Sequence, residues 1–255
     1  MRRLVISSPA QQLAAAFDAE LHARARGLRP SWNVAPTRPV PALRLHSGGR
    51  LLVAAHWGFR APWIKTGKQQ PQPISARADN LTAGMFSVGF DSARVVLPAD
   101  GFYEWRTSND GTKVPHFVHH AEGERLTLAA IASSWHDLTE PDAEPLLTVA
   151  IVTTDAGRQM RGLHDRQPVM LIAAEVDLWL KTSSSRHELL WLTASRDRVP
   201  LAVRQVSIEV NNVRNDHPGL LTKPRSAELR TSASSVGVGQ RASLPTGQLR
   251  LRLEP

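Results

Sequence analysis

The chain has 255 residues, of which 42% are hydrophobic and 21% charged, and its formal net charge at pH 7 is +8. This composition is typical of a folded globular protein, and no apolar run approaches the roughly eighteen residues of a membrane-spanning helix. The absence of cysteine excludes disulfides, thiolate metal sites and a thiol nucleophile. The positive charge favours a polyanionic partner, with nucleic acid as the first candidate.

The first predicted element is a helix that begins near Ser8. Ser8 is a candidate N-cap residue, with Pro9 at the first helical position and Gln11 completing a capping box. Apolar residues then recur at every fourth position as far as Leu21, which predicts one amphipathic helix that ends near Arg26. The apolar stretch before this helix is too short for a secretory signal, so the protein is expected in the cytoplasm, associated with the nucleoid.

Most of the remaining elements are predicted to be short strands. Two apolar runs at residues 40–46 and 50–56 flank a serine and two glycines, which indicates a β-hairpin. Further strands are expected at residues 95–97, 116–119, 126–132, 147–153, 168–172 and 204–210, and helices at residues 174–181 and 187–194.

Many short strands with a few helices predict an α+β fold with a mixed or antiparallel sheet at its core and peripheral helices. We expect a single domain over residues 1–224. Residues 225–255 contain five arginines against two glutamates and show no apolar periodicity, so they are predicted to be a disordered basic tail.

A carboxylate among aromatic residues marks residues 97–105. A strand-like run ends at Pro98, the chain turns through Asp100 and Gly101, and Glu104 follows among three aromatic residues. Burying an unpaired carboxylate costs several kcal/mol. This position therefore indicates either a proton-transfer group or a half-exposed glutamate on an edge strand beside a core tryptophan.

A second segment combines aromatic and cationic side chains. Trp57 and Trp63 lie close to Arg60 and Lys65. Single-stranded nucleic acid is bound by such surfaces, because bases stack on rings while cations contact phosphates. The alternative is that one or both tryptophans fill the core.

Two further positions leave alternatives open. Arg77, two residues after Ser75, can contact a phosphate or form an ion pair with Asp79 or Glu104. His164 opens a short turn before an apolar run, where a histidine can transfer protons near neutral pH or can be purely structural.

The sequence predicts neither a metal site nor a cofactor. His116 and His119 are the nearest approach to a metal-binding pattern, but they cannot share one face of a strand.

Taken together, six ordered segments resemble the SRAP family, the SOS-response-associated peptidases or abasic-site-processing proteins. The resemblance covers about residues 1–222, and the tail lies outside it. The segments are residues 33–37, 57–65, 75–79, 98–105, 164–170 and 213–216.

The resemblance implies a barrel-like sheet core and binding of abasic sites in single-stranded DNA, by a protein that acts as a monomer and not at a membrane. In the family, a cysteine directly after the initiator methionine traps the sugar aldehyde as a stable thiazolidine. An asparagine, a glutamate and a histidine support this reaction, and the last two also take part in its reversal and in peptidase self-processing.

Carried over by position, Glu104 and His164 match the catalytic glutamate and histidine. The expected DNA-binding residues are Arg3, Asn33, Pro36, Trp57, Trp63, Lys65, Arg77 and Arg166.

This chain departs from the family pattern at the nucleophile. Its first residues are Met1, Arg2 and Arg3, without cysteine, and Ser75 stands where the asparagine is expected. A serine has one hydroxyl where an amide offers two donors and an acceptor, so it orients the N-terminus less well. Asp79 also replaces the usual glutamate.

Without a thiol no thiazolidine can form. The bulky Arg2 favours retention of Met1, whose α-amine can still form a Schiff base with an aldehyde.

Three hypotheses follow. The protein recognises abasic or single-stranded DNA in the DNA damage response without durable capture, which we favour. Alternatively it is a Schiff-base-forming lyase that uses Met1, Glu104 and His164, with Ser75 assisting. In the third hypothesis it is a non-catalytic DNA-binding module.

Overall fold

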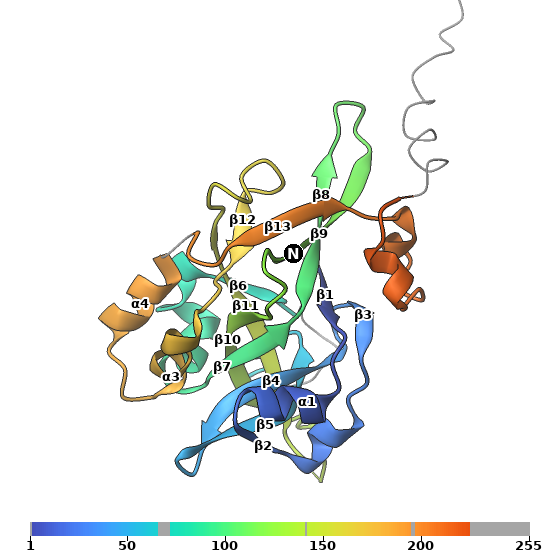
Figure 1. The fold of residues 1–255 in the computed structure, drawn as a ribbon. Coiled ribbons are helices and arrows are strands. Elements are labelled where there is room, and N and C mark those ends of the chain that lie inside the picture. Colours follow the sequence, from blue (N-terminus) through green and yellow to red (C-terminus); the bar gives the residue numbers. More distant parts are fainter. Residues whose placement is uncertain (1, 66–71, 141, 195–196, 225–255) are drawn as a thin grey trace, which may run out of the picture.

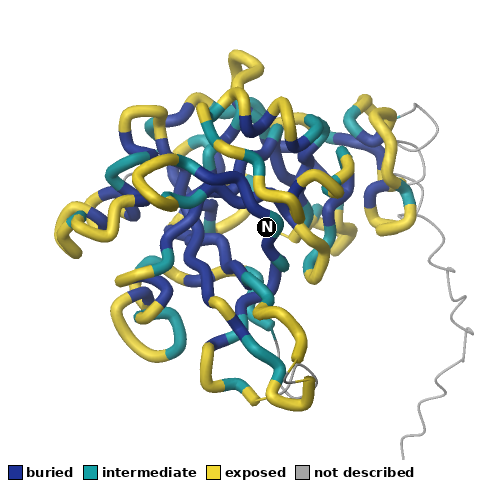
Figure 2. The backbone as a smooth tube through the Cα atoms, turned by 90° about the horizontal axis from the view of Figure 1, so that it is seen from below, coloured by how far each residue is buried: buried dark blue, intermediate teal, exposed yellow. Residues whose placement is uncertain are grey.

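Two β-sheets form the body of the protein in this computed structural model, which describes residues 2–65, 72–140, 142–194 and 197–224. Figure 1 shows the sheets joined by the chain as it passes from β7 (Arg94–Ala99) directly into β8 (Gly101–Thr107). In Figure 2 the buried segments lie in the middle of the molecule and the exposed loops surround them. The expected α+β fold, with mixed and antiparallel strands and peripheral helices, is confirmed.

Five strands of the larger sheet close into a ring. β4 (Pro39–His46) pairs with β5 (Gly49–Trp57) and with β7, while β10 (Leu126–Trp135) pairs with β7 and with β11 (Leu146–Asp155). The parallel pairing of β11 with β5 completes the ring. The barrel-like core implied by the family resemblance is thereby confirmed.

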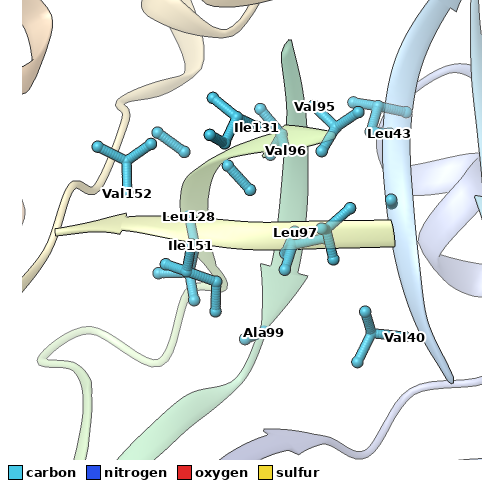
Figure 3. Close-up of a cluster of buried hydrophobic side chains, with 14 of the residues drawn as sticks. Val40, Leu43, Val95, Val96, Leu97, Ala99, Leu128, Ile131, Ile151 and Val152 are labelled. Carbon is cyan, nitrogen blue, oxygen red and sulfur yellow. The ribbon is translucent and has the colours of Figure 1, made fainter. Parts of the chain in front are cut away.

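The interior of this ring is the main hydrophobic core. Side chains from β4, β7, β10 and β11 point toward one another there, among them Leu43, Val96, Leu97 and Ile131 (Figure 3). These four side chains are fully buried. Full burial of one such aliphatic side chain contributes about 1.5–3 kcal/mol to stability, so this core provides a rigid platform for the strand ends that extend from it.

Three short strands extend the ring, and five strands make the second sheet. β2 (Ala19–Leu21) pairs with β5, whereas β6 (Ser75–Arg77) and β12 (Arg166–Pro168) both pair with β11. The second sheet has the order β13 (Leu201–Gln205), β9 (Lys113–His120), β8, β1 (Arg3–Ile6), β3 (Ser31–Val34).

The described helices are short. The α-helices are α1 (Ala10–Ala16), α2 (Ser87–Ser92), α3 (Ala173–Leu180) and α4 (Arg186–Ala194), and the 3-10 turns are η1 (Ala23–Gly27), η2 (Ala78–Asn80), η3 (Gly84–Phe86), η4 (Ile208–Asn211) and η5 (Pro218–Leu221). The buried guanidinium of Arg94 donates to main-chain carbonyls of Phe90 and Trp179, which anchors the ends of α2 and α3 to β7. No helix among the described residues is long and apolar enough to cross a membrane.

The predicted first helix is wrong in its start and in its length. Pro9, rather than Ser8, occupies the N-cap position, and the Ser8 hydroxyl instead accepts a hydrogen bond from Arg125, 2.9 Å away. The helix ends at Ala16 because Asp18 adopts a left-handed conformation (φ 47°) and the chain then pairs with β5. Local periodicity was overridden by pairing with a sheet edge.

The other predicted elements exist in the structure, although two of the strands differ in extent. The hairpin is confirmed, and its turn residues Ser47 and Gly48 both have positive φ, as the twist of a tight hairpin requires. The two later helices match α3 and α4 closely. Two strand predictions are wrong in extent: residues 204–210 leave β13 after Gln205 and enter η4, and the strand predicted at 168–172 ends at Pro168. The predicted tail, residues 225–255, lies outside the described residues.

Candidate nucleic-acid interface and carboxylate site

Two short strands flank the end of β11 and bring charged side chains together. β6 runs parallel to β11 and places Ser75 opposite Ile151 and Arg77 opposite Thr153. β12 pairs antiparallel with the same end of β11, with Arg166 opposite Asp155. Ser75 and Arg77 are exposed while Ala76 between them is buried. We call Ser75, Arg77, Asp79, Asp155 and Arg166 the β11 edge cluster.

Arg77 forms a two-pronged ion pair with Asp79. Its Nε lies 3.0 Å from Asp79 Oδ1 and its Nη2 lies 2.7 Å from Oδ2. This hydrogen bonding raises the pKa of Arg77 and lowers the pKa of Asp79. The carboxylate partner of Arg77 in this structure is therefore Asp79, and a phosphate must compete with that carboxylate.

Arg166 is held more firmly. Its Nη2 donates to the Thr153 carbonyl at 2.6 Å, and its Nη1 lies 3.1 Å from Asp155 Oδ1. Burial lowers the pKa of Arg166, and the positive charge of Arg77 lowers it further. The two guanidinium groups are therefore close enough to repel each other, and the two aspartates compensate for that repulsion.

His164 lies immediately before this strand, on the surface. Its Nδ1 accepts a hydrogen bond from the Arg166 main-chain N–H at 2.9 Å. The same Nδ1 also lies 3.1 Å from the Arg166 carbonyl oxygen. These two contacts hold the His164 ring beside Arg166.

Glu104 lies in the second sheet, on β8, and is only 4% exposed. It is directly opposite His116 on β9, which in turn is opposite Gln205 on β13. Residues opposite one another in antiparallel strands share a face of the sheet. Glu104, His116 and Gln205 therefore form one polar row, called here the Glu104 row.

The motif around Glu104 is positioned by the turn before it. Asp100 Oδ2 accepts hydrogen bonds from the Ser7 main chain at 2.6 Å and from its hydroxyl at 2.7 Å. A Cβ atom at Gly101 would collide with the Val118 carbonyl on β9. Only glycine permits this close approach of β8 to β9, which sets the register of Glu104 against His116.

His116 is electrically neutral near neutral pH. Its Nδ1 donates to the Val114 carbonyl at 2.9 Å, and burial lowers the pKa of the ring. The imidazole in the Glu104 row therefore presents an unprotonated Nε2, which is a hydrogen-bond acceptor.

The N-terminal strand approaches the same row. Leu4 is opposite Phe102 and Arg3 is opposite Tyr103, the residue before Glu104. Because neighbouring strand residues face opposite sides, Arg3 lies on the other face from Glu104, where burial lowers its pKa. Met1 lies outside the described residues.

β13 connects the two halves of the site. Gln159, in the loop that leads to His164, accepts a hydrogen bond from the Leu201 main chain at 2.6 Å and donates one to the Val199 carbonyl at 3.1 Å. β13 then pairs with β9, the neighbour of β8. The structure thus gathers Ser75, Arg77, His164 and Arg166 around β11. β13 lies beside β9 (Figure 1) and so links this region to the sheet that carries Glu104.

Two residues that were predicted to bind DNA, Trp57 and Asn33, lie in the interior of the protein instead. Trp57 has no exposed surface, and its indole N–H donates to the Ile74 carbonyl at 2.9 Å. Its ring cannot stack on a base, so Trp57 fills the core, the alternative to base stacking.

Asn33 is 4% exposed, and its amide nitrogen donates to the carbonyls of Val210, Asn212 and Asn215. Asn33 therefore anchors the segment after β13 rather than facing DNA.

Trp63 and Lys65 are on the surface as expected. Trp63 is 59% exposed, and Lys65 is also exposed. Arg60 between the two tryptophans instead lies over the Trp135 ring, 4.2 Å from its centre. Only the outer part of this segment therefore offers a stacking surface.

Sequence reasoning missed several contributors. His116 was considered only as a metal ligand, and neither Gln205 nor Asp155 was singled out. Asp155 carried a weak signal, since it ends an otherwise apolar strand. The position of His116 opposite Glu104 depends on strand register, which the sequence does not display.

Fold and site together define an α+β domain with a closed strand ring, a buried carboxylate and a surface pair of arginines. A sequence model of the SOS response associated peptidase (SRAP) family matches residues 2–213. The chain belongs to the SRAP family, which confirms the resemblance.

Three named relatives illustrate its place in this family. The chain is 31% identical to the abasic site processing protein YoqW of Bacillus subtilis (strain 168), over 75% of this chain and 85% of YoqW. It is 30% identical to YedK of Escherichia coli (strain K12), over 74% and 83%. It is also 31% identical to HMCES of Gallus gallus, over 81% and 71%.

Solved structures agree on the fold. A Bacteroides thetaiotaomicron protein superposes with a TM-score of 0.78 at 19% identity, covering 88% of this chain and 99% of that one. At this identity the likeness concerns the fold alone.

Proposed function

We propose that this protein recognises abasic sites in single-stranded DNA, as part of the DNA damage response, without stable covalent capture of the damaged sugar. The observation that carries the proposal is the pair Arg77 and Arg166 beside the exposed Ser75, in a chain that contains no cysteine. The relatives' names, abasic site processing proteins, supply the substrate class.

The β11 edge cluster suits a phosphodiester backbone. Two guanidinium groups project near each other from β6 and β12, and arginine binds phosphate through paired N–H groups. A phosphate that replaces Asp79 as the partner of Arg77 keeps one negative charge beside Arg77 and Arg166, so their repulsion stays compensated. The exposed Trp63 ring and Lys65 add a surface for an unpaired base and its phosphate.

A second candidate activity is reversible Schiff-base formation. β1 pairs with β8 as far as Arg3 opposite Tyr103, the residue before Glu104, and the candidate nucleophile is the α-amine of Met1, which lies outside the described residues. The amine nitrogen attacks the aldehyde carbon, water leaves as the C=N bond forms, and hydrolysis reverses the step. Glu104 or His164 would transfer the protons.

Denaturing gels distinguish these activities. The protein is mixed with a single-stranded oligonucleotide that carries one abasic site, with and without borohydride, which reduces an imine to a stable amine. We expect a native binding shift and no heat-stable adduct when borohydride is absent. A heat-stable adduct formed without borohydride would contradict the proposal.

An adduct that forms only with borohydride supports the Schiff-base candidate, and Glu104→Ala or His164→Ala should then reduce it. A binding shift that vanishes when residues 225–255 are deleted supports instead a module whose basic tail binds DNA.

A further inference from the structure

The strand ring has an open mouth at the end where β4 turns into β5. All five strands of the ring, together with the end of α3, line a cavity of about 780 Å³ there. Pockets for small molecules have volumes of about 300–1,000 Å³ and often lie in the mouths of β-barrels. We call this cavity the ring mouth; its lining includes Arg44, Leu45, Val95, Ala132, Leu147 and Lys181.

The ring mouth is separate from the β11 edge cluster. In Figure 1 the β4–β5 hairpin lies below the ring, and β12, which carries Arg166, lies above it. Leu147, near the start of β11, lines the mouth, whereas Asp155 at the end of β11 belongs to the cluster. These two positions are separated by roughly 26 Å of extended strand. A ligand in the mouth and DNA at the cluster can therefore bind at the same time.

Strand register directs Arg44 into this mouth. Leu43 on β4 is opposite Val96 on β7, so their neighbours Arg44 and Val95 share the other face of the sheet. Arg94 lies on the face of Val96, and its guanidinium group donates to carbonyls at the end of α3. Because α3 covers that outer face, the side chain of Arg44 faces the inside of the ring.

Arg44 lacks a protein acceptor at its buried nitrogen. Its Nε is buried and has no hydrogen-bond partner among the described residues. Val95, Ala132 and Leu147, which line the mouth with it, are apolar and offer no side-chain acceptor. A charged donor that is buried without an acceptor is costly. The position therefore favours a ligand that brings an acceptor with it.

The rest of the lining adds positive charge. Lys181 is exposed and has no ion-pair partner in the part of the chain that the structure describes. Arg94 is 4% exposed and binds main-chain carbonyls rather than a carboxylate, whereas Arg50 pairs with Asp177 at 2.8 Å. With Asp18 included, four basic side chains against two carboxylates leave a net charge of +2. A dianion matches this charge, and a single carboxylate leaves half of it uncompensated.

We infer that the ring mouth binds a small phosphate monoester with a flat ring, of the size of a nucleoside monophosphate. Arg44 and Lys181 donate to the phosphate, the former through the paired N–H groups of its guanidinium. The flat ring packs against Leu45 and Leu147, and the Ser47 hydroxyl at the hairpin turn faces the sugar. This ligand site goes beyond DNA recognition and does not depend on it.

Isothermal titration calorimetry of the full chain with deoxyadenosine monophosphate tests the assignment. We expect a Kd of about 10–100 µM for the nucleotide, about tenfold weaker binding of inorganic phosphate and no measurable binding of deoxyadenosine. Absence of nucleotide binding, or equal binding of deoxyadenosine, would overturn the inference. So would equal binding of benzoate, because the site would then be selective for a carboxylate.

A strand end also carries a phosphate monoester, and a 5′-phosphorylated trinucleotide distinguishes it from a free nucleotide. The trinucleotide should bind no more tightly than the mononucleotide, because the closed ring limits the length of the ligand. Tighter binding that depends on Arg44 would contradict the assignment to a small molecule.

The variant Arg44→Met removes the charge and keeps an unbranched side chain in the mouth. It should weaken nucleotide binding by about ten- to a hundredfold, as expected for a lost charge-assisted hydrogen bond. Its urea midpoint should not fall, because the change removes a buried donor that has no acceptor. Arg44→Lys should recover part of the affinity, since the charge returns without the planar fork. The matched control Arg106→Ala removes an exposed arginine of β8, outside the mouth, and should bind the nucleotide like wild type.

Binding of abasic DNA by Arg44→Met should equal that of wild type, which separates this site from the proposed function. Wild-type nucleotide affinity in Arg44→Met would overturn the inference. A lower urea midpoint together with reduced DNA binding would also overturn it, because Arg44 would then have a structural role.

Discussion

The β11 edge cluster and the Glu104 row place similar chemistry in opposite surroundings. In the cluster, Arg77 and Asp79 pair on the open surface, with more than half of each side chain exposed. In the row, Glu104 and His116 are buried at 4% and 8% exposure, within a sheet whose neighbouring positions are filled by Phe102 and Val118. The cluster lies at the end of β11, whereas the row crosses the middle of β8 and β9.

This difference assigns different tasks to the two regions. Exposed charges are screened by salt and exchange partners at small cost, which suits contacts with a mobile phosphate backbone. Buried polar groups interact more strongly and move less, which suits selection of one chemical group. The cluster should therefore control how tightly DNA is held, and the row should control which nucleotide is accepted.

The largest expected effect is on stability, and it distinguishes the buried Trp57 from the exposed Trp63. Trp57→Ala removes a fully buried ring and its hydrogen bond to Ile74, the residue before β6. It should lower the free energy of unfolding by about 3–5 kcal/mol, measured by urea denaturation. Trp63→Ala is the matched control: it should leave stability nearly unchanged and weaken DNA binding through lost stacking. Equal destabilisation by both changes would break the distinction.

The second prediction is a crossed pair of variants. Arg166→Ala should flatten the salt slope of DNA binding by about 0.7 and preserve the affinity ratio for abasic over intact DNA. Glu104→Gln should preserve the slope and reduce the ratio toward one. Anisotropy titrations of both variants against both oligonucleotides measure these quantities. A variant that changes both the salt slope and the affinity ratio would contradict the separate tasks of the cluster and the row.

A smaller effect concerns competition for Arg77. Asp79→Asn removes the carboxylate that occupies this guanidinium, so a phosphate no longer has to displace it. DNA affinity at low salt should increase about two- to fivefold. Asp91→Asn, which changes the same charge at an ion pair with Arg186, serves as the control. Unchanged or reduced affinity for Asp79→Asn would show that Arg77 does not contact phosphate.

The smallest effect is a pH dependence due to two histidines, the half-buried His56 and the buried His116. Burial lowers the pKa of both His56 and His116 below the ordinary value. The unfolded chain therefore binds protons more readily than the folded protein, and stability falls as pH decreases through about 6.5. Urea midpoints between neutral and mildly acidic pH should show this decline.

His116→Gln should reduce that decline. The Arg77–Asp79 pair should be unaffected over the same range, because the pKa of Asp79 is lowered. A midpoint that does not change with pH would contradict the lowered pKa of the two histidines.

Strand prediction succeeded where local chemistry was decisive. The β4–β5 hairpin followed from residues that tolerate positive φ, and the turn before Glu104 followed from Asp100 and Gly101. The first helix failed because the fourfold spacing of Leu13, Phe17 and Leu21 resembles a helical stripe. In the structure Leu21 instead belongs to a strand at the edge of β5, a long-range pairing that outweighs a few tenths of a kcal/mol of helix propensity.

The site was predicted in its residue types but only partly in its geometry. Glu104, Arg77 and His164 were singled out by their sequence surroundings and then matched family motifs, and Arg166 was named from that match. Trp57 and Trp63, six residues apart, were indistinguishable in sequence, yet one is buried and the other is mostly exposed. Burial depends on what packs against a residue, and for Trp57 that is the strand ring and the segment before β6.

The sequence by itself determined the chemistry available to this protein: a basic chain with no thiol, a glutamate after a glycine turn and arginines near polar strand ends. These follow from residue identity and from turns a few residues long. Only the tertiary structure decided which groups meet, because Ser75, Arg77 and Arg166 come together through pairing with β11, and His116 meets Glu104 through the register of β8 and β9. Pairings between distant segments are set by the packing of the whole core, which no local pattern encodes.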